Sequence, residues 1–253
     1  MKYLYLCVNY DSSATLEKTI PVWKKLCNGI EIYIVDNFKS IEERKAVSEI
    51  CKEFNATIIC NENNGYGDAL NKGIDVILSN PNYDGKSILF FGNSDIIPIE
   101  RILPINNNGV PVLNIYQEGR KLNPFLTKLE SAFIWILCLS AKLHSKTLLY
   151  LWYAFRRLVS VYRGKSVAAV HGSLFCLSLA EAAKLHPIFD SKVFLYCEEL
   201  FFMRKIMRNN LSYTESPYVF EHIGSVSTGK TIKLDDKAYF DNWCKSMKIY
   251  CDD

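Results

Sequence analysis

The stretch NENNGYGDALNKG at residues 61–73, followed after a polar gap by ILFFGNSD at residues 88–95, predicts the fold of this chain. Its pattern is typical of a Gly- and Asn-rich turn that opens a helix, followed by a buried strand. Gly65 and Gly67 permit positive φ angles and let the backbone approach a ligand closely, and the first amides of the helix are donors for an anion. We therefore expect a phosphate-facing corner here, with an ordinary strand-to-helix turn as the alternative.

Residues 87–91 are apolar and aromatic, as expected of a central parallel strand that is covered on both faces. Asp95 follows this strand closely. Open α/β sheets bind ligands at the carboxyl ends of their strands. A single carboxylate at this position suits a divalent ion that is shared with substrate phosphates. The alternative is that Asp95 only caps the next element.

Strands and helices alternate through the N-terminal part of the chain with short connections between them. This alternation predicts an α/β fold with a mostly parallel, Rossmann-like sheet flanked by helices. Asn9, Asp36, Asn64 and Asp95 then lie together at the carboxyl edge of the sheet. The expected strands are residues 3–8, 31–35, 57–60 and 87–91, and the first two expected helices are residues 12–27 and 40–54.

Length and composition indicate a single globular domain. The chain has 253 residues, of which 49% are hydrophobic and 23% charged, so wholesale disorder is excluded. The net charge of +3 is too small to indicate a nucleic-acid partner. Basic residues are concentrated in residues 120–165, which hold nine Lys or Arg and one acid, so the rest of the chain carries a net charge of −5.

The nine cysteines are scattered and show no zinc-binding spacing. Several, including Cys138, lie in apolar runs where a free thiol behaves as a small hydrophobic group, so we expect a reducing, cytoplasmic compartment. The first apolar run is too short for a signal peptide. No uncharged apolar run reaches the roughly 18 residues of a transmembrane helix.

Residues 126–161 contain two apolar helical patches with aromatic and basic residues at their margins. They fit two amphipathic helices packed on the sheet or in a homodimer interface. They also fit a peripheral membrane contact through residues 126–163, in which aromatic side chains lie at headgroup depth and basic ones attract anionic lipid. The side chains assigned to that contact are Trp135, Tyr150, Trp152, Tyr153, Lys142, Arg156, Arg157 and Arg163.

The C-terminal part offers two further groups of polar residues. A strand is expected at residues 167–175, with His171 and Gly172 near its end, and another at residues 211–220 that leads to His222. Glu198 and Glu199 open a helix with strongly apolar flanks. Such flanks raise the pKa of a carboxyl group and suit it to act as a base. The alternatives are a structural histidine at position 171 and simple helix-dipole complementarity for the two acids.

Six motifs in this order resemble the bacterial family-2 glycosyltransferases of the GT-A fold, in particular those that build capsule or O-antigen chains, rhamnosyltransferases included. The resemblance covers residues 3–115 and 167–230. It implies a nucleotide-sugar-binding half (residues 1–115), a helical apolar and basic insertion (116–166) and an acceptor and catalytic half (167–253). The motifs are VNYDSS, IYIVDN, NNGYGDALNKG, FFGNSD, FDSKVFLYCEELFFMRK and EHIGSVSTGK.

The resemblance also implies roles for individual residues. Asp95 binds Mg²⁺ or Mn²⁺, with His222 as a candidate second ligand, while Gly172 and His171 lie beside the acceptor. Glu199 aligns with the catalytic base, and Glu198 remains the alternative. Asp95 is the only carboxylate at the metal position, so metal affinity before donor binding is expected to be weak. The implied donor-binding residues are Asn9, Tyr10, Asp36, Asn64, Gly65, Asn71, Asn93 and Lys230, with Ser227 and Thr228 beside the phosphates.

The activity implied by the resemblance is inverting transfer of a sugar from a UDP- or dTDP-linked donor to a polyprenyl-diphosphate-linked glycan. The expected location is the inner face of the cell membrane. Two other classes stay open. A non-catalytic scaffold of this fold would explain the incomplete metal motif and the Glu-Glu pair. A nucleotidyltransferase is less favoured, because Tyr10-Asp11-Ser12 stands where a Gly-rich, basic loop would hold a triphosphate.

Overall fold

The computed structural model describes residues 1–103, 109–159, 166–224 and 236–252. The strands are β1 (Tyr3–Asn9), β2 (Glu31–Asn37), β3 (Thr57–Asn61), β4 (Ile88–Asn93), β5 (Ile96–Pro98), β6 (Val110–Gln117), β7 (Arg120–Lys121), β8 (Leu126–Thr127), β9 (Val167–Ala169), β10 (Leu174–Ser178) and β11 (Tyr213–His222). The helices are α1 (Ser13–Leu26), α2 (Ile41–Glu53), α3 (Tyr66–Leu78), α4 (Lys128–Ser131), α5 (Trp135–Lys142), α6 (Lys146–Val159), α7 (Leu179–Leu185), α8 (Glu198–Arg208) and α9 (Lys237–Asp252).

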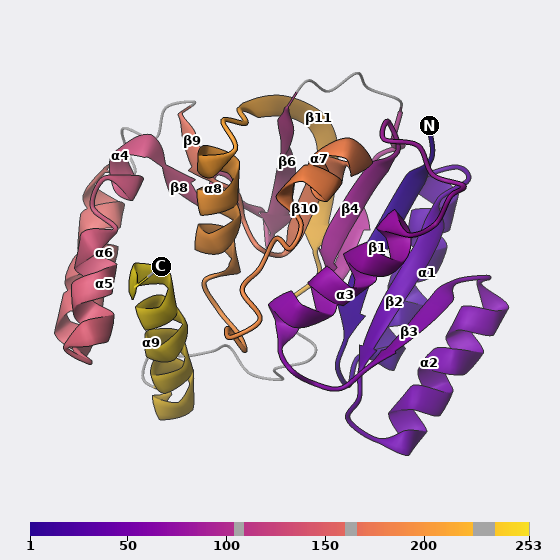
Figure 1. The fold of residues 1–253 in the computed structure, drawn as a ribbon, viewed down its shortest axis with the longest axis horizontal. Helices are drawn as coiled ribbons and strands as arrows, with labels where there is room; N and C mark the ends of the chain where they lie inside the picture. Colours follow the sequence, from indigo (N-terminus) through magenta and orange to yellow (C-terminus); the bar gives the residue numbers. More distant parts are fainter. Residues whose placement is uncertain (104–108, 160–165, 225–235, 253) are drawn as a thin grey trace.

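The central sheet has the strand order β10-β4-β1-β2-β3, and β4, β1, β2 and β3 run parallel (Figure 1). Only β10 is antiparallel to its neighbour β4. Along β1, Leu4 and Leu6 pack into the core on one face, whereas Tyr5 and Cys7 pack into the core on the other. Because helices cover both faces, successive residues are all buried, which confirms the mostly parallel sheet expected from the apolar strands.

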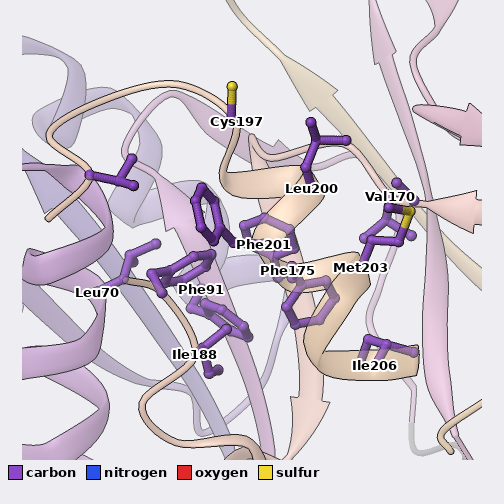
Figure 2. Close-up of a cluster of buried hydrophobic side chains, with 14 of the residues drawn as sticks. Leu70, Phe91, Val170, Phe175, Ile188, Cys197, Leu200, Phe201, Met203 and Ile206 are labelled. Atoms are coloured by element: carbon purple, nitrogen blue, oxygen red, sulfur yellow. The ribbon is translucent and has the colours of Figure 1, made fainter. Parts of the chain in front are cut away.

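Helix α8 packs on the central sheet through aromatic and aliphatic side chains. Figure 2 shows Phe201 and Met203 of this helix gathered with Phe91 of β4 and Phe175 of β10. Phe175 also contacts Phe202, with ring centroids 4.6 Å apart. Burying one such side chain contributes about 1.5–3 kcal/mol. This packing fixes the start of α8, where the two predicted carboxylates lie.

A second sheet has the order β5-β11-β6-β7. Its strand β11 pairs with β5 in an antiparallel register that sets His222 opposite Ile96. The amide of Ile223 donates to the carbonyl of Asp95 at 3.0 Å. The expected late strand is therefore present, and its register brings His222 next to the turn that follows β4.

The single strand expected at residues 167–175 is wrong, because the chain forms two strands with different partners. In β9, Ala169 pairs with Leu126 of β8, whereas in β10, Phe175 pairs with Phe91 of β4. Since the two strands belong to separate sheets, the backbone turns between them. His171 and Gly172 lie in that turn and not in a strand.

Helices α5 and α6 pack against each other, and α5 also packs against the C-terminal helix α9. A disulfide joins Cys138 of α5 to Cys251 of α9, so the expectation of a free thiol at Cys138 is wrong. Trp152 is buried and Arg156 forms an ion pair with the buried Glu130, which contradicts their assignment to a membrane-facing surface. Within the described residues, no helix is both long enough and apolar enough to cross a membrane.

Candidate active site

A cavity of about 760 Å³ lies at the carboxyl ends of β1 and β4, and the start of α8 forms part of its wall. Residues from both halves of the chain line it, and Asp95 and Glu199 therefore share one cavity as the sequence predicts. Most of the predicted site residues contribute to the wall. They are Tyr10, Gly65, Asn93, Asp95, His171, Gly172, Glu198, Glu199 and His222.

Asn9 and Asp36 do not line the cavity, contrary to the prediction that they contact the nucleotide. Both are fully buried. The Asn9 side-chain amide donates to Asp36 Oδ1 at 3.0 Å, and Asp36 Oδ2 accepts from Arg44 Nε at 2.7 Å. These contacts link the ends of β1 and β2 to α2, and they support the cavity wall from behind.

The Gly-rich turn also has a structural role. A Cβ atom at Gly65 would lie 2.6 Å from the carbonyl oxygen of Phe194, and the amide of Tyr66 donates to that same oxygen at 2.9 Å. Gly67 in turn packs against Phe189. The close approach is thus to the segment before α8, and the first amide of α3 is already used. Because Gly65 also lines the cavity, the phosphate contact of this corner stays a prediction.

Asn71 holds the same segment. Its side-chain amide donates to the carbonyl of Phe189 at 2.8 Å and accepts from the amides of Ile188 and Phe189 at 3.0 and 3.2 Å. The predicted donor contact of Asn71 is therefore replaced by a structural one. Asn64 does not line the cavity either, although its neighbour Asn63 does.

Asp95 and His222 face each other across the junction of the two sheets. Asp95 Oδ1 lies 3.2 Å from His222 Nε2, and both side chains are about nine-tenths buried. The two atoms are not aligned as a hydrogen bond and have no other partner in the described part of the chain. Lys230, Ser227 and Thr228, which were predicted to meet the phosphates, lie outside the described residues.

A carboxylate oxygen and an imidazole nitrogen that are buried, adjacent and unpaired fit a divalent cation. In residues 1–103, 109–159, 166–224 and 236–252, no group of three or more His, Cys, Asp or Glu side chains could hold a metal. Asp95 and His222 would therefore supply two ligands, and the remaining positions would need oxygen atoms from a bound diphosphate and from water.

Glu198 and Glu199 begin α8 after an unusual backbone turn. The two preceding residues, Tyr196 and Cys197, have left-handed φ angles of 75° and 70°. Glu199 Oε1 accepts the amide of Gly172 at 3.2 Å. A Cβ atom at Gly172 would lie 2.7 Å from the same oxygen. Gly172 therefore makes room for Glu199. Because it also lines the cavity, its predicted place beside the acceptor stays a prediction.

The two carboxyl groups differ in their surroundings. Burial raises the pKa of Glu198 to about 8, and the neighbouring charge of Glu199 adds to the rise. Burial also raises the pKa of Glu199, but its own amide, the amide of Gly172 and the guanidinium of Arg156 oppose that rise. A carboxylate with donors around it holds its charge more easily. Glu198 therefore holds a proton more readily than Glu199, and Glu199 is the carboxylate better suited to accept one.

His171 lies on the wall beside His222, with ring centroids 6.4 Å apart. Burial lowers the pKa of His171 to about 4, and electrostatic interactions with His222 and Arg156 contribute further. Its Nδ1 lies 2.9 Å from the hydroxyl of Ser173. His171 is therefore a neutral imidazole at neutral pH, able to exchange hydrogen bonds with an uncharged ligand.

Several tyrosines line the cavity at positions where the sequence did not predict a site, and Tyr153 lies there contrary to its predicted place in a membrane contact. Tyr66 donates to Asn93 Oδ1 at 2.8 Å, and Tyr153, Tyr196 and Tyr239 come from three separate segments. Tyr66 could have been identified from the sequence as a lining residue, because it directly follows Gly65 in the Gly-rich turn. The other three converge only through packing of α6, α8 and α9, which no short motif reports.

No protein-family model and no curated protein sequence matches this chain. Solved structures do match. A structure of TarS from S. aureus is 13% identical with a TM-score of 0.52, over 89% of this chain and 37% of that one. The mannosyltransferase PcManGT from Pyrobaculum calidifontis, in complex with GDP-Man and Mn²⁺, is 13% identical with a TM-score of 0.54, over 89% of this chain and 58% of that one.

Glucosyl-3-phosphoglycerate synthase from Mycobacterium tuberculosis, in complex with Mn²⁺, UDP and glucosyl-3-phosphoglycerate, is 13% identical with a TM-score of 0.52. That match covers 95% of this chain and 76% of the synthase. The chain therefore spans well under two thirds of the length of the first two structures. The strand order, the placement of the cavity and these matches together show that the chain has the GT-A glycosyltransferase fold.

Proposed function

We propose that this protein is an inverting glycosyltransferase that moves a sugar from a nucleoside-diphosphate donor to a hydroxyl group of a glycan. The observation that carries the proposal is that Asp95 and Glu199, which come from distant parts of the sequence, line one cavity at the carboxyl edge of the sheet. Structures of proteins with the same fold hold UDP or GDP-Man together with Mn²⁺, which supports a nucleotide-sugar donor. We propose a UDP- or dTDP-linked sugar.

In the proposed reaction, Glu199 accepts the proton of the acceptor hydroxyl as that oxygen attacks the anomeric carbon. The bond from the anomeric carbon to the diphosphate breaks, and its electron pair leaves with the nucleotide. Asp95 and His222 would hold Mg²⁺ or Mn²⁺, which supplies positive charge to the leaving group. Glu198 keeps its proton, so the base does not face a second full negative charge beside it.

A donor screen tests this proposal. Ligands that bind only the folded state raise its melting temperature, so UDP-, dTDP- and GDP-sugars are compared with and without Mn²⁺. We expect one nucleotide class to stabilise the protein in a metal-dependent way and to be hydrolysed slowly or transferred. A protein that binds nucleotide-sugars but never releases nucleotide with any acceptor extract would instead be a non-catalytic binding protein.

We further propose that the acceptor is carried on a polyprenyl diphosphate and met at the inner face of the cell membrane. Exposed apolar side chains support this: Trp135 and Leu139 on α5, Leu143 directly after it, and Tyr150 and Leu158 on α6. Residues 131–159 include no Asp or Glu, although several Lys and Arg are present. An apolar face without acids fits an anionic lipid surface.

Vesicle sedimentation tests the membrane contact. Each basic residue near an anionic leaflet contributes about 1 kcal/mol, so the protein should pellet with phosphatidylserine vesicles more than with neutral ones at low salt. The double variant Trp135→Ser/Leu139→Ser should lose most of this binding. The matched control Met207→Ser, which removes an exposed apolar side chain on α8, should not. Equal pelleting with both vesicle types would contradict the proposal, and a doubled solution mass would assign the face to a homodimer.

A further inference from the structure

A side cavity of about 180 Å³ lies behind the two carboxylates of the main cavity. It is formed by α5, α6, α9 and the start of α8, so much of it is built by the insertion and the C-terminal helix. The side cavity and the main cavity share the lining residues Tyr153, Tyr196, Glu198, Glu199 and Tyr239. A ligand bound at Glu199 could therefore extend from the main cavity into the side cavity.

The wall of the side cavity is aromatic at its inner end and hydroxylated at its mouth. Phe125, Trp152 and Trp243 contribute aromatic rings. At the mouth, the rings of Tyr196 and Tyr239 are 4.6 Å apart, and Tyr153 lies across from them on α6. Large aromatic faces with a polar handle bind ligands that are apolar on one side and hydroxylated on the other. A sugar ring has both properties.

Charge limits what can enter. Of the residues that line the side cavity, all of which are described, only Arg156 is basic. Its Nε donates to Glu130 Oε1 at 3.0 Å and its Nη2 to the carbonyl of Phe125 at 2.6 Å, so these donors are already engaged. Glu198 and Glu199 stand at the mouth. A phosphate group there would lose its hydration beside two acids, which is costly. A ligand of this cavity therefore carries no phosphate or other anionic group, as holds for an ordinary sugar ring.

On the basis of the glycosyltransferase function proposed above, we propose that the side cavity binds a second, uncharged sugar unit of the acceptor, next to the unit that reacts. The hydroxyls of Tyr153, Tyr196 and Tyr239 bond this unit, and the aromatic walls stack on it. The acceptor then carries at least two sugars at its reacting end. The enzyme extends a glycan and does not attach the first sugar beside a phosphate.

Two variants on one helix test the proposal. Leu149 is buried and lines the side cavity, so Leu149→Phe fills it. Leu151→Phe makes the same change at an exposed position of α6 that lines neither cavity, and serves as the matched control. Tyr239→Phe removes one hydroxyl with almost no change in volume. It therefore still tests binding in the side cavity if Leu149→Phe disturbs the packing of the protein.

Binding of defined saccharides is measured by saturation-transfer NMR in the presence of UDP and Mg²⁺. The probes are methyl α-glucoside, methyl α-rhamnoside, maltose, cellobiose and glucose 1-phosphate. We expect at least one disaccharide to bind better than the monosaccharides, and glucose 1-phosphate to bind no better than the methyl glycosides. Leu149→Phe should weaken disaccharide binding about tenfold, equivalent to 1.4 kcal/mol, and Tyr239→Phe several-fold, with Leu151→Phe unchanged.

The proposal is overturned if no disaccharide binds, if glucose 1-phosphate binds best, or if Leu149→Phe and Tyr239→Phe both bind disaccharide like the unaltered protein. UDP binding is followed in the same samples by thermal stabilisation. Saccharide binding without nucleotide binding would remove the glycosyltransferase function but keep a saccharide site. Nucleotide binding without disaccharide binding would remove only the present inference.

Discussion

The main cavity has two acidic walls, a first wall with Asp95 and a second wall with Glu198 and Glu199. Each wall positions its carboxylates differently. Asp95 is positioned by strand pairing, because the register of β5 with β11 sets it beside His222. Glu198 and Glu199 are positioned by a helix start that packs on the sheet through apolar neighbours. The first wall presents unpaired lone pairs, which suit a cation, and the second presents a partly protonated pair, which suits proton exchange. Carboxylates therefore serve two different roles in one cavity because their surroundings differ.

Removing the carboxylate of the first wall should have the largest effect. Asp95→Asn keeps the shape but loses the charge that would hold a divalent cation, which is worth several kcal/mol of transition-state stabilisation. We expect both metal-dependent donor binding and sugar transfer to be lost, as measured by Mn²⁺-dependent melting shifts and nucleotide release. Glu221→Gln, at an exposed position of β11, is the control. If Asp95→Asn retained turnover, the metal-binding role assigned to the first wall would be wrong.

On the second wall, Glu199→Gln removes the proton acceptor and leaves the first wall intact. Transfer should fall by about 10²–10⁴-fold, the usual contribution of a general base, while donor binding with Mn²⁺ stays within a few-fold. Steady-state kinetics with a working acceptor, together with the melting shift, separates the two quantities. If Glu198→Gln lost as much transfer as Glu199→Gln, the assignment of the base to Glu199 would be wrong.

A smaller effect is expected from Gly172→Ala, which pushes the Glu199 carboxylate aside. The new Cβ would lie 2.7 Å from Oε1, at the flexible end of the side chain, so we expect transfer to fall about tenfold, since misplaced catalytic groups are costly, and the melting temperature to change little. Adding Glu199→Asp to this variant shortens the acid and should recover part of the loss. Independent, additive losses in the double variant would show that the two residues do not interact.

The last prediction concerns the stability of the folded state and its dependence on pH. The pKa of Glu198 is about 8 in the folded protein against an ordinary value of 4.5. The folded state holds this proton more tightly, so the stabilisation is complete below pH 4.5 and is lost as the pH rises through 8. Glu198→Gln cannot ionise. As the pH rises from 5 to 8, its free energy of unfolding should therefore increase by a few kcal/mol at most relative to that of the unaltered protein. An equal difference in melting temperature between Glu198→Gln and the unaltered protein at pH 5 and at pH 8 would refute this prediction.

The sequence predicted most of the fold, because strands and helices are encoded by local patterns. The apolar runs of β1, β2 and β4 and the helix cap at Ser40, whose hydroxyl accepts the amide of Glu43, have short-range physical causes. The position of Asp95 directly after a buried strand was likewise enough to predict that it lies at the carboxyl edge of a parallel sheet. The prediction that Glu199 shares a cavity with Asp95 came from the resemblance to the GT-A glycosyltransferases and not from a local pattern.

Contacts between residues that are distant in the sequence could not be predicted from local patterns. Neither the split of residues 167–175 between two sheets nor the Cys138–Cys251 disulfide has a local signature. The burial of Asn9, Asp36 and Asn71 against other polar groups likewise depends on which segments meet. The role of Gly172 is another example, since its neighbour Glu199 comes from a different element.

The amino-acid sequence alone therefore determined the α/β architecture and the position of Asp95 at the edge of its sheet, because hydrophobic periodicity and turn chemistry act over a few residues. Only the tertiary structure decided which polar side chains face the cavity, which acid keeps its proton, and that aromatic residues of α6, α8 and α9 enclose a second space beside them. Those features depend on packing between segments far apart in the chain, and burial and charge at a site are properties of the assembled surroundings.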